Sequence, residues 1–95
     1  MDFLSKLDFT DQDIKLLNDC VPDLIKELIK ENQKLVVINI NYLKNLGIKN
    51  YREVFMKFFD MFLLDVSTFK DIFEKYETED LINKIQENVG IVEFL

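Results

Sequence analysis

The sequence predicts an all-α domain, either a compact bundle or a short solenoid-like array of five to six short helices. The 95 residues include only two glycines and one proline, whereas a β-sandwich or barrel needs many turn residues. Hydrophobic residues make up 48% and charged residues 32% of the chain, as is typical of a soluble globular domain. Two apolar stripes at helical spacing run through residues 51–76, which hold six of the nine phenylalanines. We therefore expect a single helical domain over residues 1–95.

The first two helices are predicted from capping residues and a proline. Residues 1–9 are rich in large apolar side chains and are expected to form a turn or short helix that packs on the core. Thr10 and Asp13 are an N-cap pair, because each can accept a hydrogen bond from a free backbone amide, and they predict a helix over 11–20. Pro22 ends that helix and can occupy the first turn of the next one. The apolar faces of these two helices are expected to comprise Ile14, Leu17, Cys20, Val21, Leu24, Ile25, Leu28 and Ile29.

Residues 35–46 fit two secondary structures. The β-branched residues Val36, Val37, Ile38 and Ile40 would suit a strand. An apolar stripe at helical spacing and the lack of an obvious partner strand favour a helix instead. We predict a helix that ends at Gly47 in the left-handed conformation, with Ile48 making the hydrophobic contact that often follows such an ending.

Three further helices are predicted in the second half of the chain from polar residues that can cap them. The expected caps and helices are Asn50 with Glu53 for 51–63, Ser67 or Thr68 for 69–76, and Thr78 for 79–88, which Gly90 ends. The apolar tail over 91–95 is expected to pack into the core or against a partner, and would also suit a fragment of a longer chain. The expected core consists of Leu28, Val36, Ile40, Leu43, Val54, Phe55, Phe58, Phe62, Phe69, Ile72, Phe73, Leu81 and Ile85. Tyr76 is expected to be buried with them.

The residue types argue against an enzyme. Histidine is absent, which removes the commonest general base and the commonest metal ligand. The single cysteine, Cys20, is read as a small buried hydrophobic residue, and one cysteine cannot form a zinc site. An acidic cluster between residues 74 and 80 lacks the alternating spacing and central glycine of a calcium loop. We expect no catalytic residues, no metal site and no cofactor.

Charge and hydropathy bear on location and partners. No apolar run approaches the roughly 18 to 20 residues of a membrane span, and residues 1–9 lack the basic and apolar regions of a signal peptide. We therefore expect a cytoplasmic protein that does not contact membranes. The net charge is −6, and residues 51–95 carry ten acidic and five basic residues, so they contribute −5 of it. Such a field repels nucleic acid and favours basic partners.

These observations predict a non-enzymatic protein–protein interaction module. Its partner would present a basic or an apolar patch, and a homo-oligomer through the apolar surplus is a further expectation. Methionine beside phenylalanine makes an adaptable apolar surface, and Phe59 is the phenylalanine expected at the edge of the core. The candidate contact residues are Met56, Phe59, Asp60, Met61, Glu74, Glu77, Glu79 and Asp80.

One segment resembles a known family. Residues 36–76 are similar to about one repeat of the mitochondrial transcription termination factor type, a resemblance carried by Leu43, Leu46, Gly47 and Ile48 and supported by Val54, Phe58, Leu63 and Leu64. The resemblance implies stacked helices and, as an alternative function, a nucleic-acid-associated helical module. The proline usual before the two leucines is absent, and the surface is acidic rather than basic. A third interpretation, based on net charge and size, is a small acidic inhibitor that mimics the charge of nucleic acid toward a basic target, as some phage-encoded proteins do.

Overall fold

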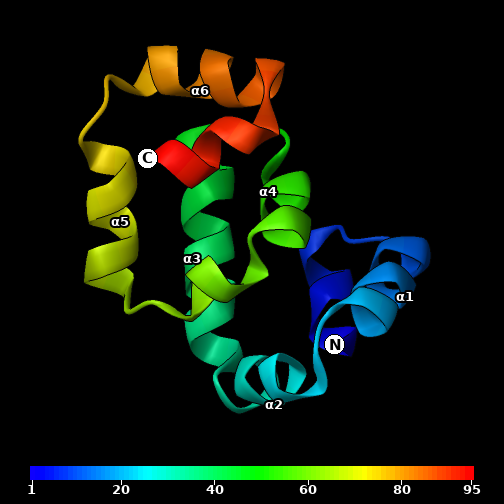
Figure 1. Ribbon diagram of the computed structural model, residues 1–95. Coiled ribbons are helices and arrows are strands. Elements are labelled where there is room, and N and C mark those ends of the chain that lie inside the picture. Colours follow the sequence, from blue (N-terminus) through cyan, green and yellow to red (C-terminus); the bar gives the residue numbers. More distant parts are fainter.

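The computed structural model describes all residues 1–95 and confirms the all-α prediction, since it contains no strand (Figure 1). The six α-helices are α1 (Asp11–Cys20), α2 (Asp23–Glu31), α3 (Gln33–Leu46), α4 (Tyr51–Lys57), α5 (Val66–Glu74) and α6 (Thr78–Glu87). Three short 3-10 helices complete the chain: η1 (Asp2–Leu7), η2 (Phe59–Leu63) and η3 (Val89–Phe94). The radius of gyration is 12.7 Å, close to the ~12 to 13 Å of a compact domain of this length.

Helix α3 passes through the middle of the molecule, and the other elements pack around it (Figure 1). In Figure 1, α2 lies at the start of α3 and α6 lies across its end, while α5 runs along one side. The N-terminal elements η1 and α1 lie on the other side, next to α4. The C-terminal η3 packs against α6. Helix α3 therefore contacts elements from both halves of the chain: η1 and α2 from the first, and α4, η2 and α5 from the second.

The predicted start of α1 and end of α3 are both confirmed. Thr10 and Asp13 form a reciprocal capping box, in which each side chain accepts the other residue's backbone N–H at 3.0 and 3.1 Å. Gly47 ends α3 at a φ of 104°, and the amide of Ile48 donates to the carbonyl of Leu43 at 3.2 Å. Ile48 is buried, so it makes the expected hydrophobic contact. Residues 35–46 are therefore helical, within an α3 that begins at Gln33.

The single helix expected over 51–63 is wrong. Helix α4 ends at Lys57, Phe58 adopts φ −126° and ψ 43°, and the chain continues as the tighter η2. A continuous helix would have placed its phenylalanines on one face. After the break, Phe62 is fully buried while Phe58 is only half-buried, so tertiary packing overrides the local helical period.

Several predicted helix caps and ends are also wrong, and for α5 and α6 the carboxylate of a neighbouring residue does the capping. The Asn50 side chain does not cap α4; its amide donates instead to the carbonyl of Ile85 at 3.0 Å. Asp65 caps α5 by accepting from the amide of Thr68, so α5 starts at Val66 and not at 69. Glu77 caps α6, and Thr78 is its first residue. The α6 helix ends at Glu87, before Gly90, which lies inside η3.

A line of aromatic rings runs through the core. Ring centroids are 5.6 Å apart for Phe9 and Phe55, 5.0 Å for Phe55 and Phe62, 4.9 Å for Phe62 and Phe69, and 5.1 Å for Phe69 and Phe73. Pairs at these separations contribute ~0.5 to 1.5 kcal/mol each beyond the burial of their area. The aromatic stretch predicted from residues 51–76 therefore does form the centre of the fold, joined by Phe9 from the N-terminal segment.

Some residues expected in the core lie outside it. Leu28 is 37% exposed, because α2 faces the core with Ile25 and Ile29 and turns its two leucines outward. Ile72 and Phe58 are half-buried. Cys20 is exposed, since Leu17 and Val21 form the buried edge of this part of the chain. Tyr76 is 40% exposed, because α5 ends before it and the helical spacing no longer applies. The other ten expected core residues are buried: Val36, Ile40, Leu43, Val54, Phe55, Phe62, Phe69, Phe73, Leu81 and Ile85.

Candidate functional site

The eight predicted contact residues do not form one surface. Met56 and Phe59 line one hollow, and Glu77 and Asp80 line another, built from different elements. The remaining four line neither hollow: Asp60, Met61, Glu74 and Glu79. Met61 is half-buried against the core. The carboxylate of Asp60 accepts a hydrogen bond from the amide of Met61 at 3.1 Å.

The first hollow is lined only by apolar residues, and we call it the Met56–Phe59 pocket. It has a volume of about 190 Å³ and lies between α1 and the junction of α4 with η2. Its lining residues are Leu16, Leu17, Cys20, Val21, Met56 and Phe59. Leu16 is 47% exposed and Cys20 is exposed, while Met56 and Phe59 are half-buried. The break at Phe58 positions this pocket, because it turns Phe59 towards α1 rather than along a continued α4.

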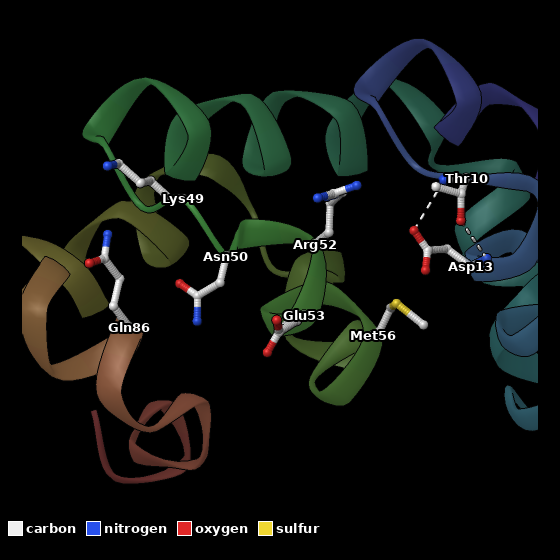
Figure 2. Close-up of a pocket in the computed structure, with 8 residues that line it drawn as sticks. All are labelled: Thr10, Asp13, Lys49, Asn50, Arg52, Glu53, Met56 and Gln86. Atoms are coloured by element: carbon white, nitrogen blue, oxygen red, sulfur yellow. Dashed lines mark hydrogen bonds between the residues drawn. The ribbon is translucent and has the colours of Figure 1, made fainter.

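A polar pocket adjoins this apolar one and shares Met56 with it (Figure 2). Its volume is about 400 Å³. The lining residues are Thr10, Asp13, Lys49, Asn50, Arg52, Glu53, Met56 and Gln86. Figure 2 shows Lys49, Asn50 and Gln86 towards one end and the hydrogen-bonded Thr10 and Asp13 at the other.

The polar pocket carries two acidic and two basic side chains, so its charges balance. Asp13 is engaged in the capping box, and Arg52 donates to the carbonyl of Asp8 at 2.9 Å. The Asn50 side chain ties α4 to α6, and its own oxygen has no partner within the chain. The pocket therefore offers both hydrogen-bond donors and hydrogen-bond acceptors to a ligand.

The second hollow lies between α6 and η3, and we call it the α6–η3 groove. It has a volume of about 230 Å³ and combines apolar residues with two carboxylates and one amine. Its lining residues are Tyr76, Glu77, Asp80, Leu81, Lys84, Ile91, Phe94 and Leu95. Sequence reasoning named Glu77 and Asp80 but placed Tyr76 in the core. The apolar tail over 91–95 is the sequence signal for Ile91, Phe94 and Leu95, whereas Leu81 was expected in the core and no signal indicated Lys84.

Glu77 has a structural role in addition to its place in the groove. Its carboxylate accepts hydrogen bonds from the amides of Glu79 and Asp80, at 3.3 and 2.8 Å, and so caps α6. Asp80 takes part in neither of the two ion pairs of the chain. Asp80 is therefore the groove carboxylate that is free to meet a ligand.

A third polar cluster joins the N-terminal segment to α3 and α4. Lys44 lies 3.1 Å from the carboxylate of Asp8, and the hydroxyl of Tyr51 donates to the carbonyl of Leu7 at 2.9 Å. The hydrogen bond and charge of Lys44 hold the pKa of Asp8 below its ordinary value, and Asp8 in turn raises the pKa of Lys44. Burial raises the pKa of Tyr51. The cluster holds η1 in place and has no groove or pocket of its own.

No three acidic or cysteine side chains gather into a group that could hold a metal ion. None of the helices has both the length and the apolar character that crossing a membrane requires. Comparison of the chain with family models, curated proteins and solved structures finds no match.

Proposed function

We propose that this chain is a non-enzymatic protein-binding module whose contact surface is centred on the Met56–Phe59 pocket. The observation that carries the proposal is the position of Met56 between an entirely apolar pocket and a polar one. Protein interfaces commonly have this anatomy, with an apolar centre that loses water and a polar rim that stays hydrated. An apolar side chain of a partner would enter the pocket, and its polar neighbours would face Arg52 and Glu53.

The pocket lining favours a partner that inserts a large apolar group. Burying apolar surface contributes ~25 cal/mol per Å², and Leu16 still exposes 47% of its area. Methionine and phenylalanine side by side can adapt to the shape of what enters. On α1, three aspartates stand against one lysine, and Asp60 lies on η2. The flanks of the pocket on α1 and η2 are thus acidic, whereas the charges of the polar pocket balance; the acidic flanks favour a partner with basic residues beside its apolar anchor.

A pull-down from extracts of the native host, with three versions of the chain as bait, tests this proposal. The wild type is compared with Leu16→Glu, which places a charge in the pocket, and with Leu24→Glu. Leu24 is 69% exposed on α2 and does not line the pocket, so it is the matched control. We expect a partner that binds the wild type and Leu24→Glu but not Leu16→Glu, and that slows thiol modification of Cys20. Equal retention by all three baits would contradict the proposal.

A second copy of the chain is the competing occupant of the pocket. Sedimentation equilibrium at several concentrations separates the two cases, because a homodimer through this surface would dissociate in Leu16→Glu and persist in Leu24→Glu. A wild-type chain that stays monomeric at high concentration would exclude the homodimer.

The nucleic-acid-associated module implied by the repeat resemblance stays a prediction, as does the acidic inhibitor. The net charge of −6 argues against the first, since binding to phosphate backbones depends on basic residues. A gel-shift assay at low salt with DNA and RNA fragments is its test. Retardation of either fragment would favour the nucleic-acid module over the protein-binding one.

A further inference from the structure

The α6–η3 groove is a separate surface from the pocket at Met56, and it exposes large aromatic side chains. Phe94 is 79% exposed and Tyr76 is 40% exposed, although both flank an apolar floor that includes the buried Leu81. Aromatic residues at the rim of an apolar hollow are typical of binding hot spots. In Figure 1 this region lies where η3 packs beneath α6, away from α1. The groove and the Met56–Phe59 pocket share no residue.

Helical spacing places the charged residues of the groove along one side. Asp80 and Lys84 lie one turn apart on α6, about 6 Å along the helix, and Glu77 precedes them as the N-cap of the helix. The acidic end of this row lies beside Tyr76, and the single amine lies at the other end. η3 supplies the opposite wall with Ile91 and Phe94. The groove thus has an apolar floor, an acidic end and an aromatic rim.

The charge around the groove selects between classes of occupant. Residues 74–95 contain six acidic and two basic residues, so this segment carries −4 of the net charge of −6. An acidic surface repels nucleic acid, anionic lipid and a second copy of the same acidic chain. A segment with lysine or arginine next to a large apolar side chain is attracted by the carboxylates and buries its apolar group on the floor.

We infer that the α6–η3 groove is a second docking surface, which binds a basic segment of a partner protein through an apolar side chain flanked by lysine or arginine. Asp80 provides the unpaired carboxylate, and Phe94 covers the apolar side chain. This inference goes beyond the proposed function, because it concerns other residues and does not depend on the Met56–Phe59 pocket. Together the two surfaces would allow the chain to hold two partners at once.

The test uses the full chain and a fluorescein-labelled amphipathic peptide of leucine and lysine, with a leucine–glutamate peptide of the same pattern as the charge control. Fluorescence anisotropy measures the Kd of each. We expect the leucine–lysine peptide to bind, with an affinity that falls as the salt concentration is raised. The leucine–glutamate peptide should not bind. Equal binding of the two peptides would overturn the inference.

Paired variants locate the binding. Phe94→Ser is expected to weaken binding about tenfold or more, and Asp80→Asn several-fold. The matched controls are Leu24→Ser and Asp19→Asn, which change exposed residues outside the groove and should leave the Kd unchanged. An unchanged Kd for Phe94→Ser would overturn the inference.

Leu16→Glu separates this inference from the proposed function. If Leu16→Glu abolishes peptide binding and Phe94→Ser does not, the peptide occupies the Met56–Phe59 pocket and the groove proposal fails. If Phe94→Ser alone abolishes binding, the groove proposal holds whatever binds near Met56. A second copy of the chain is the remaining candidate occupant of the groove, and sedimentation equilibrium without peptide tests for it. If the wild type is a dimer and Phe94→Ser is a monomer, a second copy fills the groove and the inference fails.

Discussion

The side-chain amide of Asn39 donates a hydrogen bond of 3.0 Å to the backbone carbonyl of Phe62, across a sequence separation of 23 residues. The same nitrogen donates to the carbonyl of Leu64, also at 3.0 Å. Asn39 is the one polar residue buried among the core side chains. These two bonds satisfy carbonyls at the end of η2, where the short 3-10 helix leaves them without helical partners. A side chain on α3 thus completes the backbone of a distant segment.

Asn39→Ala is expected to destabilise the protein by ~2 to 4 kcal/mol, because it leaves two carbonyls without a donor and opens a small cavity. Urea denaturation measures the change. Asn45→Ala is the control, since Asn45 is exposed on the same helix and its replacement should change stability by less than ~0.5 kcal/mol. If the two variants were equally stable, the hydrogen bonds of Asn39 would not contribute to the fold.

Gly47→Ala is expected to destabilise the protein by ~1 to 2 kcal/mol, for two reasons. Gly47 has a φ of 104°, which side chains other than glycine rarely adopt, and an added Cβ would lie 3.2 Å from the Cδ1 atom of Ile82. Gly90→Ala is the comparison, because an added Cβ there would also meet a close neighbour, Oδ1 of Asn88 at 3.1 Å, but Gly90 does not have a positive φ, so the difference between the two variants reports the backbone conformation. In thermal unfolding followed by circular dichroism, the Tm of Gly47→Ala should be clearly lower than the Tm of Gly90→Ala. The opposite order would contradict the role assigned to Gly47 as the end of α3.

Asp8→Asn is expected to lower the stability of the protein at neutral pH. It should also make stability depend less on pH in the acidic range. The pKa of Asp8 is lowered by its hydrogen bond and charge interaction with Lys44 from an ordinary value of 3.8. The contribution of a carboxylate with a depressed pKa is fully present above its unfolded-state pKa and is lost as the pH falls through its folded-state pKa. The wild type and the variant should therefore differ most above pH 3.8 and converge at lower pH.

This substitution isolates the charge, because asparagine tolerates the left-handed conformation that Asp8 adopts at a φ of 69°. Urea midpoints between about pH 2 and pH 7 provide the measurement. Asp19→Asn, at an exposed residue without an ion pair, serves as the control. A difference between wild type and Asp8→Asn that stayed constant with pH would exclude the pairing with Lys44 as its cause.

Cys20 is expected to react with Ellman's reagent in the folded protein, because its side chain is exposed at the edge of the Met56–Phe59 pocket. A buried thiol would react only as fast as the protein unfolds. The rate without denaturant should therefore lie within about tenfold of the rate in urea. A thiol that became reactive only in urea would show that α1 buries Cys20 after all.

The parts of the fold that could be predicted are those set by neighbouring residues. The capping box of Thr10 with Asp13 and the ending at Gly47 depend on a few adjacent positions, and both are confirmed. The break at Phe58 could not be predicted, because it depends on how Phe62 packs between Phe55 and Phe69. Asn50 was misread for the same reason, since its partner, Ile85, lies 35 residues away.

The candidate site was predictable only in part. Hydrophobic pattern identified Met56 and Phe59 as surplus to the core, and the structure places both in one pocket. The hydrophobic pattern did not identify α1 as the other wall of this pocket, because the exposure of Leu16 and Cys20 depends on how α1 packs against the rest of the molecule. The aromatic rim of the groove was hidden for a different reason. Its two members lie outside α-helices, at the end of α5 and in η3, where helical spacing gives no guidance.

The polar contacts of Asp8, Asn39 and Tyr51 also bear on the order in which the molecule folds. Each joins segments more than 20 residues apart, and Tyr51 reaches Leu7 across 44 residues. Contacts at such separations form only after the intervening chain has closed, whereas the helices need only neighbouring residues. η1 should therefore be stabilised after α3 and α4 have met. Substitutions at Tyr51 would then raise the unfolding rate and leave the folding rate nearly unchanged.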